Sequence, residues 1–103
     1  MALTVLDLEG RLLFYNRHAP KILDRQPGYL GRDVGELHQP ASRAKLAAIL
    51  AAYRDGDLRE RAWKLPRGDK TFAVRVAPLV LDGRISGLVH AVLLLPPAGD
   101  PER

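Results

Sequence analysis

The 103-residue chain contains no cysteine, which excludes a disulfide framework, a thiolate metal site and a cysteine nucleophile. It also lacks a run of roughly 18 to 20 apolar residues, the length that a membrane-spanning helix requires. The longest apolar stretch, residues 87–97, is interrupted by His90. The N-terminus lacks the charged region, the apolar stretch and the cleavage site that together mark a secretory signal. These absences predict a cytoplasmic protein with no membrane partner.

Clusters of one charge are missing as well. Lysine and arginine (16) outnumber aspartate and glutamate (12), yet no five basic residues follow one another. This interspersed pattern favours a solvated, arginine-rich surface over a nucleic-acid site. An anion- or nucleic-acid-binding basic module remains an alternative, and it predicts steeply salt-dependent binding. The 47% hydrophobic content and the chain length indicate one folded domain with one core.

The first part of the chain predicts a β-hairpin that leads into a short helix. Residues 2–6 and 12–15 are strand-like, and residues 7–10 contain the Asp and Gly that favour a turn. Asn16 stands where strand gives way to helix, so its side-chain oxygen can cap the first turn. The helix is expected to be short because Pro20 is tolerated only near a helix start.

The middle of the chain contains one strong helix signal. Residues 24–33 indicate a loop, residues 34–37 can form one helical turn, and a long helix is expected to begin near Pro40 or Ser42. Gly56 is suited to end that helix in the left-handed conformation. Its apolar stripe has the i, i+3, i+4, i+7 spacing of one helix face and consists of Leu46, Ile49, Leu50 and Tyr53.

Three more strands are predicted over residues 58–65, 70–81 and 84–95, joined by turns at residues 66–69 and 82–83. The resulting fold class is α+β: a five-stranded antiparallel sheet with short helices and one longer helix packed on one face. We expect this domain to span residues 1–95. The Pro-rich tail, residues 96–103, is expected to be disordered.

The last strand is apolar on both faces after Gly87, and an apolar strand needs cover on both faces. The predicted helices can cover only one of them. We therefore expect the outer face, with Val89, Ala91 and Leu93, to be buried in a homodimer or against a partner protein. The alternative is an ordinary central strand with a few exposed leucines.

The order of these parts resembles the PAS sensory domain along residues 2–95. The resemblance implies the same sheet-and-helix fold, frequent pairing through the outer sheet face, and a pocket that holds haem, flavin, a small acid or nothing. The order and spacing of the motifs are specific for the fold but not for a ligand. The motifs are Asp7-Leu8-Glu9-Gly10-Arg11, Tyr15-Asn16-Arg17-His18-Ala19, Tyr29-Leu30-Gly31-Arg32, Leu65-Pro66-Arg67-Gly68-Asp69-Lys70-Thr71-Phe72 and Asp82-Gly83-Arg84-Ile85-Ser86-Gly87.

Histidine is the residue type that bears on cofactors. The light-sensing branches of the PAS family rely on a cysteine, so its absence argues against flavin photochemistry. Haem needs an axial ligand, usually histidine; His38 and His90 are the candidates, and the predicted long helix carries none. For His38 the sequence favours a loop or capping role, and for His90 a buried neutral histidine with one hydrogen-bond partner. His18 is expected on the exposed side of its helix.

Catalytic and metal-binding patterns are lacking. No His-x-x-x-His pair or carboxylate cluster indicates a metal site, and neither Ser42 nor Ser86 has a sequence-defined base. Arg75 is expected to form a cross-strand ion pair with Glu60 rather than to bind an anion. No catalytic residue is assigned, and the chain is predicted not to be an enzyme.

We therefore predict a PAS-type sensory or signalling module that dimerises or binds a partner through its sheet face and can hold a small ligand between sheet and helices. Ligand-dependent repacking of the pocket would pass through the sheet to the outer face. A haem-binding gas or redox sensor using His38 or His90 is the alternative. The candidate pocket residues are Leu46, Ile49, Leu50, Tyr53, Phe72, Val74, His90 and Val92.

Overall fold

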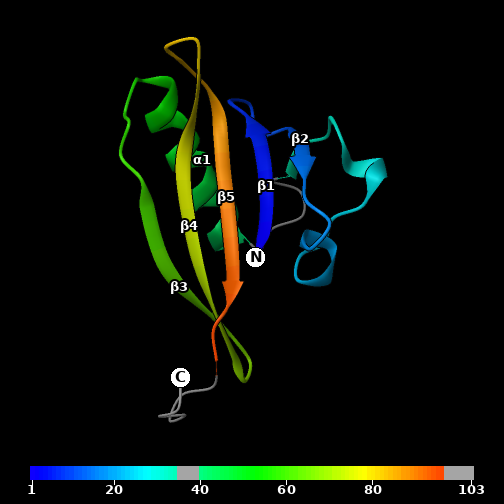
Figure 1. Ribbon diagram of the computed structural model, residues 1–103. Coiled ribbons are helices and arrows are strands. Elements are labelled where there is room, and N and C mark those ends of the chain that lie inside the picture. Colours follow the sequence, from blue (N-terminus) through cyan, green and yellow to red (C-terminus); the bar gives the residue numbers. More distant parts are fainter. Residues whose placement is uncertain (35–39, 97–103) are drawn as a thin grey trace.

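A computed structural model of the chain describes residues 1–34 and 40–96 (Figure 1). Its five strands form one antiparallel sheet in the order β2-β1-β5-β4-β3, and α1 lies behind one face of that sheet. The predicted α+β class, with a five-stranded antiparallel sheet and one longer helix, is confirmed. The elements are β1 (Ala2–Asp7), β2 (Leu12–Tyr15), the 3-10 helices η1 (Ala19–Lys21) and η2 (Pro27–Tyr29), α1 (Pro40–Arg54), β3 (Arg61–Arg67), β4 (Lys70–Leu81) and β5 (Arg84–Leu94).

The N-terminal hairpin and its cap form as expected. The Asp7 carboxylate accepts backbone hydrogen bonds from Glu9 at 3.0 Å and Arg11 at 2.8 Å, which closes the turn between β1 and β2. The side-chain oxygen of Asn16 accepts from the backbone N–H of Ala19, the first residue of η1, at 3.0 Å; the N-cap residue itself, His18, makes no side-chain cap bond. The same oxygen accepts from the Leu3 N–H at 3.1 Å, which ties the start of η1 to β1.

The centre of the sheet joins the two ends of the folded chain. β5 pairs with β1 on one side and with β4 on the other, so it is covered by backbone partners along both edges. Gly87 lies opposite Asp7, where a Cβ atom would collide with the carbonyl oxygen of Leu6. The turn between β4 and β5 has positive φ at both Asp82 (51°) and Gly83 (76°), as a tight hairpin requires.

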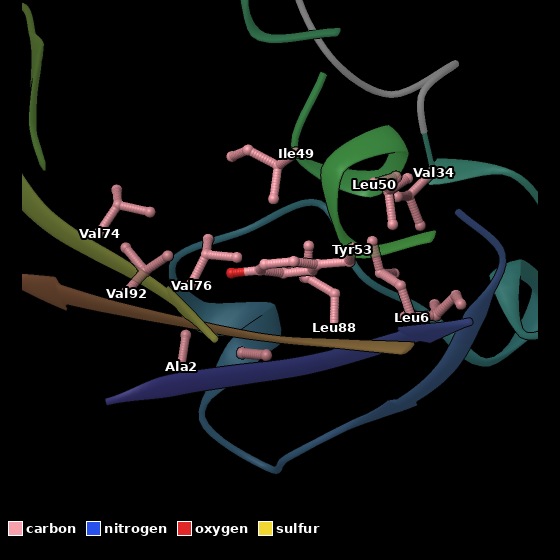
Figure 2. Close-up of a cluster of buried hydrophobic side chains, with 12 residues drawn as sticks. Ala2, Leu6, Val34, Ile49, Leu50, Tyr53, Val74, Val76, Leu88 and Val92 are labelled. Carbon is pink, nitrogen blue, oxygen red and sulfur yellow. The ribbon is translucent and has the colours of Figure 1, made fainter. Parts of the chain in front are cut away.

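The hydrophobic core lies between α1 and the inner face of the sheet (Figure 2). Tyr53 lies flat between the helix and the strands, and only 1% of it is exposed. The predicted stripe faces the sheet, because Ile49 and Leu50 are buried beside Tyr53 and Leu46 packs partly against the same cluster. The sheet contributes Ala2, Leu6, Val74, Val76, Leu88 and Val92 to this core.

The first residues predicted for the third strand do not join the sheet, which begins at Arg61 rather than at residue 58. Two local hydrogen bonds explain the difference. The Asp57 carboxylate accepts from the backbone N–H of Arg59 at 2.9 Å, and the Tyr53 hydroxyl donates to the carbonyl of Arg59 at 2.9 Å. The strand also runs to Arg67, past Pro66, because an edge strand tolerates a residue that cannot donate to the ladder.

Several predictions fall on residues that the structure does not describe. These are residues 35–37 of the expected helical turn, the haem candidate His38, and residues 97–103 of the tail. Val34, the first residue of that turn, is described and is buried in the core. None of the described helices combines the length and apolarity needed to cross a membrane.

Candidate ligand cavity and outer sheet face

A cavity of about 620 Å³ lies between the first half of α1, the segment that follows η1, and the inner faces of β3, β4 and β5. Cavities that bind small molecules in proteins span roughly 300–1,000 Å³ and are mostly apolar, with a few placed polar groups. This one fits that description. Its apolar lining consists of Ile22, Leu23, Ala41, Leu46, Ile49, Trp63, Leu65, Phe72, Val74, Val76 and Val92, and its polar lining of Asp24, Arg25, Ser42, Lys45, Lys64, Arg67 and His90.

Most of the candidate pocket residues meet at this cavity. The six that line it are Leu46, Ile49, Phe72, Val74, His90 and Val92. Leu50 and Tyr53 are not among the lining residues, because they lie further along α1, where the helix packs closely on the sheet. Leu50 lies close to the turn between β1 and β2: a Cβ added to Gly10 would be 3.3 Å from its side chain.

Arg25 is the polar residue that sequence reasoning missed. It lies two residues after the apolar pair at 22–23, and only 8% of it is exposed. Its Nε donates to the hydroxyl of Thr4 on β1 at 3.2 Å, and its Nη1 donates to the carbonyl of Asp24 at 2.9 Å. The pKa of the Arg25 guanidinium is lowered, because the effect of burial outweighs the opposing effect of the Asp24 charge. An arginine still remains protonated at neutral pH.

The other cations of the lining lie nearer the solvent. The ammonium of Lys45, an exposed residue of α1, lies 3.7 Å from the centre of the Trp63 ring on β3. Such a cation–π contact spans the gap between helix and edge strand. Arg67 adds another positive side chain from β3, whereas Lys64 is in register with Ala73 and Leu93, in a row of the outer sheet face.

His90 is the described histidine that reaches the cavity. It lies on β5 between Thr4 of β1 and Val76 of β4, and its Nδ1 atom is buried. His18 is exposed, as expected, and does not line the cavity. His38 lies outside the described residues, so the structure places only one of the two haem candidates.

Away from the cavity, acidic groups are paired with arginines. Arg75 bonds to Glu60 at 3.2 Å, which confirms the predicted ion pair. Asp57 accepts from the side chains of Arg59 at 2.9 Å and Arg61 at 3.0 Å, and these bonds, the Arg59 ones foremost, hold the pKa of the Asp57 carboxyl well below its usual range. Within residues 1–34 and 40–96, no three histidine or acidic side chains cluster closely enough to hold a metal ion.

The outer face of the sheet, opposite α1, is apolar at its centre. Val89 and Ala91 are partly exposed and Leu93 is 46% exposed. In the strand register Val89 and Ala91 lie opposite Val5 and Leu3 of β1, and Leu93 lies opposite Ala73 of β4. None of the described elements covers this face (Figure 1).

Comparison with known proteins identifies the fold family. A family model described as PAS domain matches residues 1–93. No curated protein sequence matches the chain. Because the family model covers most of its length, the chain belongs to the PAS domain family.

Solved structures show the same fold at low sequence identity. The sensor region of a sensor histidine kinase is 18% identical, with a TM-score of 0.67; the match covers 90% of this chain and 38% of that one. The PAS domain of Bordetella pertussis BvgS is 16% identical, with a TM-score of 0.71 and coverage of 94% and 78%. The PAS domain of the Cronobacter turicensis RpfR quorum-sensing receptor, in complex with BDSF, is 14% identical, with a TM-score of 0.67 and coverage of 92% and 93%.

Proposed function

We propose that this PAS domain is a non-enzymatic sensory module, which binds a small molecule in the cavity under α1 and pairs with a second copy through its outer sheet face. The observation that carries the proposal is the position of β5. Its inward residues His90 and Val92 line the cavity, while its outward residues Ala91 and Leu93 lie on the uncovered apolar face. Similar folds in the sensor region of a histidine kinase and in a quorum-sensing receptor support a signalling role.

Side chains of β5 alternate between the cavity and the outer sheet face, so a change at the ligand can be transmitted to the partner through this one strand. Successive side chains of a strand point to opposite faces, so a shift of the backbone at Val92 also moves Ala91 and Leu93. A ligand can change the pairing of two copies only to the extent that it binds one arrangement of the domain more tightly. Filling the cavity would repack the inner face of β5 and favour one arrangement of the outer face.

Oligomeric state tests the pairing. Light scattering coupled to size-exclusion chromatography, over a series of protein concentrations, is expected to show a dimer for the wild type. Leu93→Lys would place a charge in the centre of the interface and yield a monomer. Leu58→Lys is the matched control, because Leu58 is 64% exposed and belongs to none of the strands. A wild type that stays monomeric throughout, or a Leu93→Lys variant that dimerises like the control, contradicts the proposed pairing.

The position of His90 also favours a second candidate, a haem-binding gas or redox sensor. His90 lines the cavity, and histidine is the usual axial ligand of haem, which supports this candidate. Titration of the purified protein with haemin would then produce a Soret band whose position changes in His90→Ala. Protein that takes up no haemin rules out this candidate, and a band that is identical in His90→Ala rules out His90 as the axial ligand.

A further inference from the structure

We infer that the cavity recognises a small organic acid, with its carboxylate bound to Arg25 and its apolar body lodged beneath the first half of α1. The inference rests on the proposed function, since it names the class of ligand that the cavity would take. Three features of the cavity lead to it: a buried cation that makes no ion pair with a described carboxylate, unused hydrogen-bond donors on that cation, and the distribution of charge around an apolar interior.

Arg25 is a buried charge with incomplete compensation. Among the described residues, no carboxylate oxygen lies within 4.0 Å of its guanidinium nitrogens. Asp24 is adjacent in sequence, but it is exposed and its carboxylate accepts from the Tyr29 hydroxyl at 3.5 Å. A buried cation is unfavourable unless it is paired and hydrogen-bonded, so a carboxylate brought into the cavity would supply what the described residues do not.

The donors of Arg25 suit a carboxylate. A guanidinium has five N–H groups in a planar fork, and the bonds to Thr4 and Asp24 use one on Nε and one on Nη1. These two bonds leave two N–H groups on Nη2 and one on Nη1 available to a ligand. A parallel pair of N–H groups matches the two oxygens of a carboxylate, which makes charge-assisted and directional bonds. The bond to Thr4 holds the fork in place from the sheet side.

The rest of the lining favours an anion with an apolar body. The basic side chains at the cavity are those of Arg25, Lys45 and Arg67, whereas Asp24 is the acidic one, so the cavity has an excess of positive charge. Its interior is hydrocarbon and aromatic, from Leu46 on α1 to Trp63 and Phe72 on the sheet. Arg25 is the buried one of these cations, and solvent screens the exposed ones. The buried guanidinium can neutralise one negative charge, which favours a monocarboxylate over a phosphate dianion.

Calorimetric titration with three probes of equal chain length tests the inference: decanoate, decanol and decyl phosphate, each below its micelle-forming concentration. Wild type is expected to bind decanoate about 10- to 100-fold more tightly than decanol, as the loss of a charged hydrogen-bond pair predicts. It should also prefer decanoate to decyl phosphate. Arg25→Gln is expected to remove the preference over decanol without weakening the binding of decanol.

Matched variants separate this role from a structural one. Arg67→Gln removes a cation from the exposed rim and is expected to change decanoate binding by less than about threefold, since exposed charges contribute little. Arg25→Lys retains the charge but loses the fork, so it is expected to bind decanoate with intermediate affinity. It serves as the test if Arg25→Gln does not fold.

The outcomes distinguish this inference from the proposed function. If wild type binds decanol as tightly as decanoate, or if Arg25→Gln loses both equally, the carboxylate site is overturned while ligand binding in the cavity stands. A preference for decyl phosphate overturns the choice of a carboxylate. If none of the three probes binds, the acid class is overturned, and the dimerisation and haemin experiments still decide the proposed functions.

Discussion

The two halves of α1 meet the same sheet in different ways. In the second half, Leu50 and Tyr53 are 5% and 1% exposed and pack directly on the core (Figure 2). In the first half, Lys45 and Leu46 border a cavity of about 620 Å³. One amphipathic helix thus provides a packed end and an open end, and Ile49 belongs to both because it is buried in the core and also lines the cavity.

The difference indicates that the two ends of the helix contribute to different properties, stability and ligand binding. Space beneath a helix forfeits contacts that a packed core would make, so the open end contributes less to stability than an equally long packed end. The packed end should therefore determine the free energy of unfolding, and the open end should determine ligand affinity. Substitutions at the two ends can separate these quantities.

The largest contrast is expected between Leu50→Ala and Leu46→Ala, which make the same change one turn apart. Leu50→Ala opens a void in packed core and should lower the free energy of unfolding by about 2–5 kcal/mol. Leu46→Ala enlarges an existing cavity at a half-buried position and should lower it by about 1 kcal/mol. Urea denaturation followed by circular dichroism measures both. Equal losses for the two variants would contradict the division of α1 into a packed and an open end.

A smaller effect is expected when the hydroxyl at the packed end is removed. Tyr53→Phe deletes the 2.9 Å bond to the carbonyl of Arg59 and should lower the free energy of unfolding by about 1 kcal/mol. Tyr29→Phe is the matched control, because its bond to Asp24 is long, 3.5 Å, and exposed. Urea denaturation of the two variants gives the comparison. A loss in Tyr29→Phe as large as that in Tyr53→Phe would mean that the Tyr53 bond contributes nothing specific.

The face of α1 that meets the sheet was predictable from the sequence, whereas the boundary between the packed end and the open end was not. The spacing from Leu46 to Tyr53 indicates which side of the helix faces the sheet, but it does not indicate where along its length the helix lies away from the sheet. For the same reason the spacing groups Leu50 and Tyr53 with the pocket residues, although they lie in the core. Helix periodicity identifies the apolar face of a helix, but it does not indicate how closely each turn of that face packs on the sheet.

Arg25 shows a second limit of the sequence. An arginine in a loop is normally solvated, and its burial here depends on the bond to Thr4, which lies 21 residues away in the chain. Local patterns report on neighbours in sequence, such as Asn16 and the N–H of Ala19, which was predicted. The late start of β3 was missed because it depends on side-chain bonds of Tyr53 and Asp57 that compete with strand pairing.

The smallest expected effect is a pH dependence confined to the packed end, where Asp57 follows α1. Bonds from Arg59 and Arg61 lower the pKa of the Asp57 carboxyl in the folded protein, while in the unfolded chain it should titrate near its ordinary value of 3.8. A carboxyl whose pKa is lower in the folded than in the unfolded protein stabilises the fold fully above the unfolded pKa. This contribution is lost as the pH falls from the unfolded pKa through the folded pKa. Asp57→Asn should therefore be less stable than wild type at neutral pH, with a difference that shrinks below about pH 4 and in high salt.

Urea denaturation of wild type and Asp57→Asn between neutral pH and about pH 2 checks this expectation. Asp55→Asn is the control. Asp55 lies in the same turn, and its carboxylate makes no ion pair with a described residue. Asp55→Asn should follow the pH dependence of wild type. If the stability difference between wild type and Asp57→Asn stays constant down to the lowest pH, the two arginine bonds do not stabilise the ionised carboxylate. Since neither arginine bond involves a group beneath the first half of α1, Asp57→Asn should leave decanoate affinity at neutral pH unchanged.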